Sequence, residues 1–255
     1  MTAGIGLTFG SSNKAYQTFR LSYPSPLFDV IEGAAPRMSR KLAVDLGSGT
    51  GLSLPPLLQR FDHVIAVEPD GRMAEKITPH EKLEIIITHA EAFDINPRSI
   101  DLITCASAFY WMDGPALVER MATWIHPDGL IAVYRYGVPV LPARVHDIME
   151  REFRAHWNAY RSPRLIDEEY SWRCFSQSTH VRHANRQIIP NVIKMDGKSL
   201  TGFFSSTSYC SAYMRSIADA SAYLSSLGNE ISAASSGTSF DVDFSIELIT
   251  ASIMN

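Results

Sequence analysis

The sequence contains few cysteines, and they show no pairing pattern. Its 255 residues include three, Cys105, Cys174 and Cys210, which lie far apart and form no Cys-x-x-Cys pair. An odd number of scattered cysteines indicates neither a disulfide framework nor a zinc site. We therefore expect no structural metal and a reducing compartment, the cytoplasm.

Long apolar runs and basic clusters are also lacking. No stretch approaches the roughly 18 consecutive apolar residues of a membrane-spanning helix. The apolar start MTAGIGLTF is short and interrupted by glycines, unlike the leader of a secreted protein. The formal net charge is −4 and no run of Lys or Arg would hold a polyanion. We expect neither a membrane nor nucleic acid as a partner.

Short apolar runs alternate with amphipathic segments between about residues 41 and 136. The runs LAVDL, HVIAVE, LEIIIT, DLITCAS and GLIAVYRY are rich in β-branched residues and lack polar alternation, which is typical of strands covered on both faces. Helices are expected over 51–60, 70–77 and 114–124. This order predicts an α/β fold with a mostly parallel sheet and helices on both faces.

The pattern changes after these units. Residues 142–160 are predicted to be helical, 161–194 irregular, and 198–234 helical with breaks near Gly202 and Gly228. The run FDVDFSIEL alternates strictly, which indicates a half-buried antiparallel strand, most simply at the sheet edge. We therefore divide the chain into an N-terminal arm or lid (1–40), a Rossmann-like core (41–141), an inserted cap (142–235) and a C-terminal strand that completes the sheet (236–255).

The stretch VDLGSGTG suggests what the core binds. If LAVDL is a strand, Gly47, Gly49 and Gly51 lie at the carboxyl edge of the sheet, where doubly wound folds bind ligands. Their missing side chains let a ligand lie against the backbone. Glu68 ends the next strand, at the position where a carboxylate typically binds ribose hydroxyls. The ligand should therefore contain a nucleoside.

Two nucleoside cofactors fit such a loop. A dinucleotide loop usually reads G-x-G-x-x-G, but here the third glycine comes one residue earlier. Short-chain dehydrogenases require a Tyr with a Lys four positions further along, and no Tyr of this chain has one. An NAD-dependent reductase is therefore the least favoured alternative. The chain instead resembles the class I S-adenosylmethionine (SAM) dependent methyltransferases. Their first motif is an acid-x-Gly-x-Gly-x-Gly loop, and their second is an acid at the end of strand two.

This resemblance spans at least residues 40–136 and implies a seven-stranded Rossmann-like sheet with SAM as cofactor. THAEAFD resembles the family's third motif, which meets the adenine, and DLITCASAFYWMD resembles the fourth, which lines the sulfonium end. Asp70 would cap the next helix. The cofactor-binding residues that the resemblance implies in the core are Asp45, Gly47, Gly49, Gly51, Glu68, Ala90, Glu91 and Ser107.

Both ends resemble a narrower group, the trans-aconitate-like and related type 11 small-molecule methyltransferases. The segment FGSSNKAYQTFRLSYPSPLFDVI resembles one that folds over the cofactor, which implies Tyr16 near the methyl group and Arg20 near the SAM carboxylate. LTGFFSSTSYCSAY resembles the group's cap segment. That likeness implies Ser206, Ser208 and Tyr209 as residues facing the acceptor pocket.

One departure from this group concerns the fourth motif. Members commonly carry His-Trp there, whereas this chain has Tyr110-Trp111. A phenol with a pKa near 10 is a poor general base at pH 7. The base then comes from the cap, or the acceptor is already nucleophilic, or no external acceptor exists. Tyr16, Tyr110 and Trp111 are the expected catalytic residues, because aromatic faces stabilise a sulfonium by about 0.5 to 2 kcal/mol.

Residues 142–194 contain nine Lys/Arg, six Asp/Glu and four of the eight His. Under the resemblance this suggests a polar or acidic small acceptor, although the charges of RVHDIMEREFRAHW are equally those of a solvated helix face. Aromatic residues such as Trp157 and Trp172 would form a pocket wall or the cap's own core. The possible substrate contacts are His183, with His180, Arg182 and Arg186.

These observations predict a cytoplasmic SAM-dependent methyltransferase that acts on a small molecule in specialised metabolism, at oxygen, nitrogen or a carboxylate. Two alternatives keep the cofactor. The enzyme could cyclise SAM to azetidine-2-carboxylate and methylthioadenosine, as methyltransferase-like azetidine synthases do. It could also be a non-catalytic module that binds SAM or S-adenosylhomocysteine.

Overall fold

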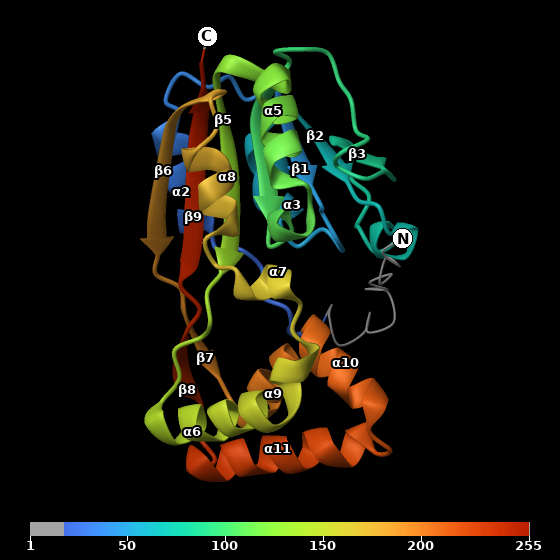
Figure 1. Ribbon diagram of the computed structural model, residues 1–255, viewed down its shortest axis with the longest axis vertical. Coiled ribbons are helices and arrows are strands. Elements are labelled where there is room, and N and C mark those ends of the chain that lie inside the picture. Colours follow the sequence, from blue (N-terminus) through green and yellow to red (C-terminus); the bar gives the residue numbers. More distant parts are fainter. Residues whose placement is uncertain (1–17, 255) are drawn as a thin grey trace. The chain divides into compact units, whose positions relative to one another are not determined.

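The computed structural model describes residues 18–254, which divide into two compact units (Figure 1). Among these residues, no helix combines the length and apolarity needed to cross a lipid bilayer. The larger unit contains residues 22–140, 162–193 and 242–254, and the smaller unit contains 18–21, 141–161 and 194–241. The segment 162–193 therefore clusters with the core rather than with the remainder of the predicted cap.

The larger unit is built on a seven-stranded sheet of order β3-β2-β1-β4-β5-β9-β6. All five runs expected to be strands are confirmed, and they pair in parallel. The order reverses between β1 and β4, which is where doubly wound sheets bind ligands. The strands are β1 (Leu42–Leu46), β2 (His63–Val67), β3 (Leu83–Ile86), β4 (Ile100–Ala106), β5 (Ile125–Tyr136), β6 (Val181–Ile189) and β9 (Ile246–Ile253).

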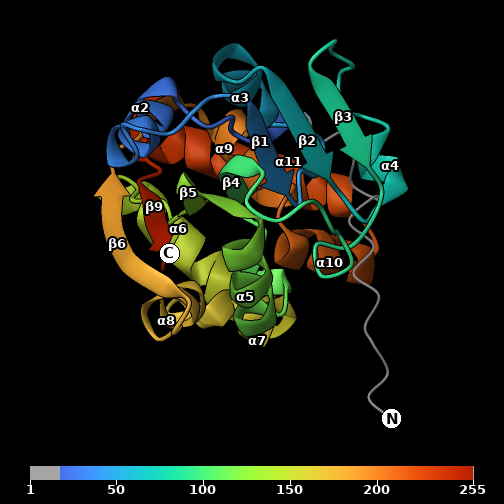
Figure 2. The same ribbon diagram turned by 90° about the horizontal axis from the view of Figure 1, so that it is seen from above.

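Helices cover both faces of this sheet, as predicted (Figure 2). On one face, α2 (Ser25–Ala34) and α3 (Leu54–Arg60) contribute buried side chains such as Phe28 and Leu57. On the other face, α5 (Gly114–Trp124) and α8 (Tyr170–Ser176) contribute Leu117 and Phe175. Two separate apolar layers thus hold the sheet in place.

The remaining elements of this unit are short. Asp70 caps α4 (Gly71–Ala74), where its side chain accepts a hydrogen bond from the Arg72 backbone N–H, as expected. The helix is only one turn, shorter than the predicted 70–77. A 3₁₀ turn, η2 (Phe109–Trp111), follows β4, and α7 (Pro163–Ile166) precedes α8.

Two predictions about the second half of this unit are wrong. Residues 161–194 are not irregular, because they form α7, α8 and the edge strand β6. The run FDVDFSIEL is not one edge strand: it divides into β8 (Phe240–Asp243) and β9, and β9 lies inside the sheet between β5 and β6. The apolar character continues to Ile253, so β9 is buried along most of its length and β6 covers its open side.

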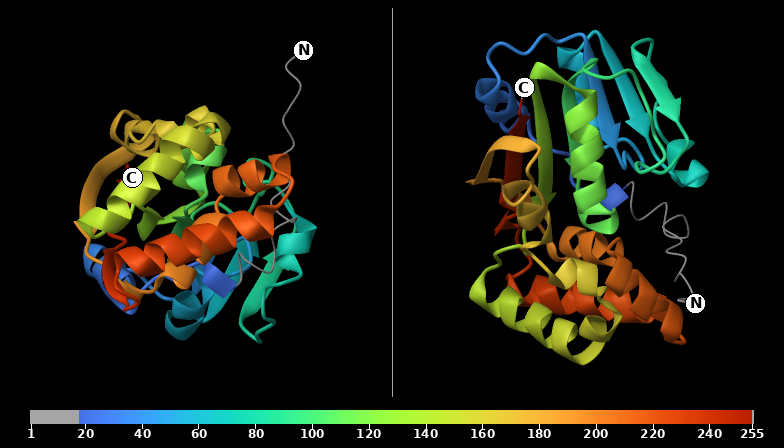
Figure 3. Two further views of the ribbon diagram at one scale, coloured as in Figure 1. Left: turned by 90° about the horizontal axis from the view of Figure 1, so that it is seen from below. Right: turned by 45° about the horizontal axis from the view of Figure 1, so that its top comes forward.

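The smaller unit is helical around an aromatic core that includes Trp157 and Phe204. Its helix α6 (Ala143–Glu152) continues into a π-helical turn, η3 (Phe153–Trp157), and a 3₁₀ turn, η4 (Asn158–Tyr160). Figure 3 shows α6, in yellow-green, and α11 (Ala220–Ala234), in orange-red, running past each other. The other helices of this unit are α9 (Gly197–Ser205) and α10 (Ser208–Ser216). A separate two-stranded sheet pairs β7 (Val192–Met195) with β8, and the boundary between the two units runs through both strands.

The predicted helix breaks at Gly202 and Gly228 are also wrong. Gly202 lies inside α9, where an added Cβ would come 2.4 Å from the Phe19 ring, and Gly228 lies inside α11. An added Cβ at Gly197 would come 2.6 Å from the Gly228 carbonyl oxygen. These glycines let α9 approach its neighbours closely. The helices instead begin anew at Thr207 and Asp219, whose side chains cap α10 and α11.

Candidate functional site

The glycine loop follows β1 at the carboxyl edge of the sheet. Gly47, Gly49 and Gly51 have φ angles of +73°, +58° and +86°, which side-chain-bearing residues rarely adopt. The Gly47 N–H donates to the Val67 carbonyl oxygen at 2.8 Å. A Cβ at Gly47 would come 2.6 Å from the Ala108 Cβ. The loop therefore presents bare backbone between the ends of β1, β2 and β4.

Asp45 is the fully buried acid beside this loop. Its carboxylate accepts hydrogen bonds from the Ser53 and Thr104 hydroxyls, both at 2.6 Å. Burial raises the pKa of Asp45, and these hydrogen bonds only partly oppose that effect. No Lys or Arg among residues 18–254 forms an ion pair with it. A positively charged ligand group would therefore be favoured next to it.

Glu68 follows β2 and ties the loop to the next helix. Its carboxylate accepts from the Gly49 N–H at 2.8 Å and from the Asp70 N–H at 2.9 Å. Burial raises the pKa of Glu68, while these two hydrogen bonds act in the opposite direction. A carboxylate has about four acceptor positions, so two donors leave it the capacity to accept from ligand hydroxyls. The ribose role stays a prediction.

The third and fourth motifs meet through a backbone contact. Glu91, which is exposed, accepts a hydrogen bond from the Asp113 N–H at 3.0 Å, and its neighbour Ala90 is buried. The adenine contact predicted for these two residues is not tested by this geometry. The contact does show that the loop after β3 and the start of α5 support each other.

Ser107 lies at the end of β4 with a positive φ of 50°, an uncommon conformation for serine. Its N–H donates to the Tyr134 carbonyl oxygen, and its hydroxyl accepts from the Tyr23 hydroxyl at 2.8 Å. Such backbone strain persists where surrounding contacts enforce it and is frequent at functional sites. Tyr110 and Trp111 follow on η2, both partly buried, with ring centroids 5.2 Å apart. The structure thus places the fourth-motif residues together.

Three predicted residues, Arg20, Ser206 and Tyr209, lie in the smaller unit. Arg20 donates to the Ser206 carbonyl oxygen at 3.2 Å, and its guanidinium lies over the Phe203 ring. Tyr209 packs against Trp157, and burial raises its pKa to about 12. The cofactor role of Arg20 and the substrate roles of Ser206 and Tyr209 remain predictions. Tyr16 lies outside the described residues.

His183 is exposed on the edge strand β6, paired in register with Ser252. It belongs to the larger unit, and its predicted contact with substrate stays a prediction. Sequence reasoning missed Thr104 and Tyr23, which hold Asp45 and Ser107. Thr104 could be found only from the register of β1 with β4, whereas Tyr23 carries a local signal, the Tyr-Pro pair before α2.

Comparison with known proteins agrees with this geometry. Residues 44–133 match the family model Methyltransf_11, a methyltransferase domain. A Dictyostelium discoideum protein named as a methyltransferase is 27% identical over 214 residues, covering 81% of this chain and 79% of that protein. A Saccharomyces cerevisiae protein named as a SAM-dependent methyltransferase is 30% identical over 146 residues, covering 54% and 49%. The chain therefore matches about half the length of the yeast relative.

Solved structures share the fold. A type II methyltransferase from Anaeromyxobacter dehalogenans superimposes with a TM-score of 0.77 at 21% identity, covering 93% of this chain and 99% of that one. A Haemonchus contortus phosphoethanolamine N-methyltransferase in complex with S-adenosylhomocysteine has a TM-score of 0.52 at 12% identity, covering 97% and 57%. The predicted class I SAM-dependent methyltransferase fold and enzyme class are confirmed.

Proposed function

We propose that this chain binds SAM at the glycine loop and transfers the methyl group to a small polar acceptor, in the cytoplasm and in specialised metabolism. The observation that carries the proposal is the combination of a bare loop, a buried acid without a cationic partner and a second acid after β2. A phosphate-binding loop would gain nothing from two neighbouring carboxylates, which repel an anion. A cofactor with an ammonium group and a ribose suits both acids.

The described residues fit SAM in three respects. The positive φ angles of Gly47 and Gly49 turn the chain at the carboxyl edge of the sheet, where doubly wound folds bind ligands. Asp45 would hold the ammonium group of the methionine part, since its carboxylate otherwise has only hydroxyl partners. Glu68 would hold the ribose hydroxyls. When bound, SAM supplies an electrophilic methyl group on a positively charged sulfur.

The chain's own residues then orient the acceptor and exclude water. Tyr110 and Trp111 present aromatic rings beside Ser107, where ring faces would attract a positive charge with about 0.5 to 2 kcal/mol. Ser107 is held rigidly by Tyr23 and by the Tyr134 carbonyl. Positioning of this kind supplies most of the rate enhancement in an in-line displacement.

The test is to incubate the purified protein with SAM alone and to identify the nucleoside by mass spectrometry. We expect tightly bound, intact SAM, with only traces of S-adenosylhomocysteine until an acceptor is added. Steady accumulation of methylthioadenosine with a four-membered-ring amino acid would replace methyl transfer with cyclisation. No binding of SAM or S-adenosylhomocysteine by calorimetry would refute the proposed function.

A further inference from the structure

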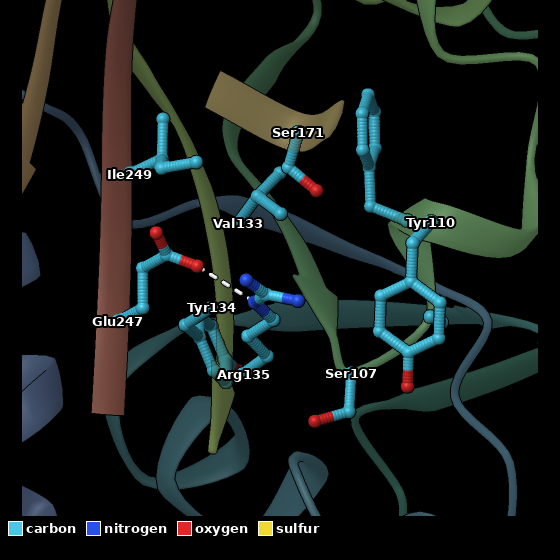
Figure 4. Close-up of a pocket in the computed structure, with 10 residues that line it drawn as sticks. Ser107, Tyr110, Val133, Tyr134, Arg135, Ser171, Glu247 and Ile249 are labelled. Carbon is cyan, nitrogen blue, oxygen red and sulfur yellow. Dashed lines mark hydrogen bonds and ion pairs between the residues drawn. The ribbon is translucent and has the colours of Figure 1, made fainter. Parts of the chain in front are cut away.

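A cavity of about 10 Å³ lies beside Ser107 in the larger unit. Figure 4 shows side chains from β5, β9, α8 and the segment after β4 converging on it. Its volume is enough for a single oxygen-sized atom. Its polar lining comes from Ser107, Tyr110, Arg135, Ser171 and Glu247. It contains none of the glycine-loop acids, so it is a separate feature at the end of β4.

The charges around this cavity cancel. Glu247 on β9 faces Arg135 on β5 in register, and its Oε2 lies 2.6 Å from the Arg135 Nε. Its Oε1 lies 2.6 Å from an Nη of Arg186, and Arg186 also pairs with Glu169 at 2.8 Å. Two arginines therefore face two glutamates. Both oxygens of the buried Glu247 carboxylate form ion pairs with guanidinium groups, and Oε2 also accepts a hydrogen bond, whereas Oε1 accepts none within the described part of the chain.

Hydrogen-bond donors remain after this pairing. The Arg135 Nη2 donates to the Glu168 carbonyl oxygen at 2.9 Å, but its Nη1 has no partner within the described part of the chain. Ser171 is 4% exposed, and its hydroxyl makes no hydrogen bond to any residue from 18 to 254. The Ser107 hydroxyl accepts from Tyr23, which leaves its own hydrogen to donate. The cavity therefore favours an atom that accepts several hydrogen bonds.

We propose that this cavity is a subsite for one neutral carbonyl oxygen of the methyl acceptor, held by Arg135, Ser107 and Ser171. The inference rests on the proposed methyltransferase function. A carboxylate is disfavoured because the four surrounding charges already balance, and its full additional charge would be uncompensated. The partial negative charge that conjugation places on a carbonyl oxygen is smaller, and hydrogen-bond donors stabilise it.

The subsite also explains how the acceptor could be deprotonated although the fourth motif supplies no general base. When a carbonyl is conjugated with a hydroxyl, hydrogen bonds to the carbonyl oxygen stabilise the anion formed as the hydroxyl proton passes to water. Such an acceptor needs no side-chain base, which agrees with the Tyr110-Trp111 pair standing where the group that the sequence resembles commonly carries His-Trp. The substrate class is a small molecule with a hydroxyl beside a carbonyl, such as an ortho-hydroxyaryl ketone.

The test is to measure how tightly three matched probe molecules bind to the complex of the protein with S-adenosylhomocysteine. Saturation-transfer NMR titration gives the affinity of each probe. The probes are ortho-hydroxyacetophenone, which carries the neutral carbonyl, ortho-ethylphenol, which lacks the oxygen, and salicylate, which carries a carboxylate. We expect the ketone to bind at least about tenfold more tightly than either of the other two probes. Ser171→Ala removes one hydrogen bond, so it should lower the affinity for the ketone about fivefold and leave the affinity for ortho-ethylphenol unchanged.

Ser176→Ala is the matched control, because Ser176 is exposed on the same helix. The double variant Arg135→Gln/Glu247→Gln keeps the charges balanced and should abolish the preference for the ketone. Equal affinity for ketone and ethylphenol, or no effect of Ser171→Ala, overturns the subsite. Tighter binding of salicylate overturns its neutral character. If the wild-type protein binds no S-adenosylhomocysteine, the proposed function itself has failed.

Discussion

Asp45 combines a proposed role in ligand binding with a cost in stability. It is fully buried, and its carboxylate is held by the Ser53 and Thr104 hydroxyls instead of a cation. Burial of a charge without a counterion is unfavourable, which is why the pKa of Asp45 is raised. A bound ammonium group would compensate this charge. The same carboxylate therefore weakens the free protein and favours the ligand complex.

Asp45→Asn should separate these two effects. Because the pKa of Asp45 is raised in the folded protein, folding favours its protonated form, and its stabilising contribution is lost as the pH rises. Relative to wild type, the variant should therefore gain stability as the pH rises above about 4, the ordinary pKa of an aspartate in an unfolded chain. Its SAM affinity should fall at least about tenfold, as expected when a buried charge loses its partner. Urea unfolding at several pH values and calorimetry measure the two changes, and a pH-independent stability difference would contradict the argument.

Glu68→Ala tests the ribose contact. Removing hydrogen bonds from a charged acceptor costs about 1.5 to 3 kcal/mol, so SAM affinity should fall about tenfold or more. Glu84→Ala, an exposed acid on the neighbouring strand β3, is the control and should leave the affinity unchanged. A loss within about threefold, roughly 0.7 kcal/mol, would show that Glu68 serves only to support Gly49 and Asp70.

The glycine loop works as a unit with the end of β4. Its positive φ angles turn the chain sharply after β1, and the close approach of Gly47 to Ala108 brings the first and fourth motifs together. The same turn lets the Gly49 N–H reach Glu68. Three segments distant in sequence thus form one edge of the sheet.

Gly47→Ala should destabilise the protein by about 2 to 4 kcal/mol, from left-handed backbone strain and overlap with Ala108. Gly33→Ala is the matched control, because Gly33 is exposed on α2 and an added Cβ meets nothing within 4 Å. That control should stabilise the protein by about 0.5 to 1 kcal/mol. Urea unfolding measures both free energies, and equal effects would refute the close approach.

Tyr170 links α8 to the segment that follows η2. Its hydroxyl donates to the Met112 carbonyl oxygen at 2.9 Å and accepts from the Gly114 N–H at 2.8 Å. Tyr170→Phe removes both hydrogen bonds and should cost about 1 to 3 kcal/mol of unfolding free energy. Hydrogen exchange should quicken at the Gly114 amide. Unchanged exchange there would show that the contact does not hold the start of α5.

The full sheet depends on the antiparallel strand β9, which lies between β5 and β6. Glu247 stands at the centre of this arrangement and pairs with Arg135 on one neighbour and Arg186 on the other. One carboxylate thus joins three strands contributed by three separate stretches of the chain. Removal of this carboxylate should therefore destabilise all three strands of the larger unit.

Glu247→Ala leaves two arginines without their shared partner. We expect a loss of about 2 to 3 kcal/mol, less than the 3 to 5 kcal/mol of fully buried pairs because the Arg186 side chain is 31% exposed. Arg135→Gln/Glu247→Gln should cost less than the single change, since it removes opposite charges together. Chemical unfolding of the wild type, the single variants Arg135→Gln and Glu247→Gln and the double variant measures this coupling, and additive losses would contradict the pairing.

The amino-acid sequence alone determined the five parallel strands, the glycine turn and the two acids beside it. These features are encoded locally, because apolar runs, glycines and acids follow one another within a few residues. Local signals were weaker in the second half. Residues 161–194 carry little periodicity and still form β6, because β9 offers an open edge with which to pair.

Only the tertiary structure decided which distant side chains meet. Thr104 reaches Asp45 because β1 and β4 pair in a particular register, and Ser171 joins Ser107 and Arg135 because α8 packs against the sheet. Gly202 and Gly228 mark places where helices approach closely, although alone they suggest breaks. Each of these outcomes depends on contacts between residues far apart in the chain, and local sequence patterns do not predict such contacts.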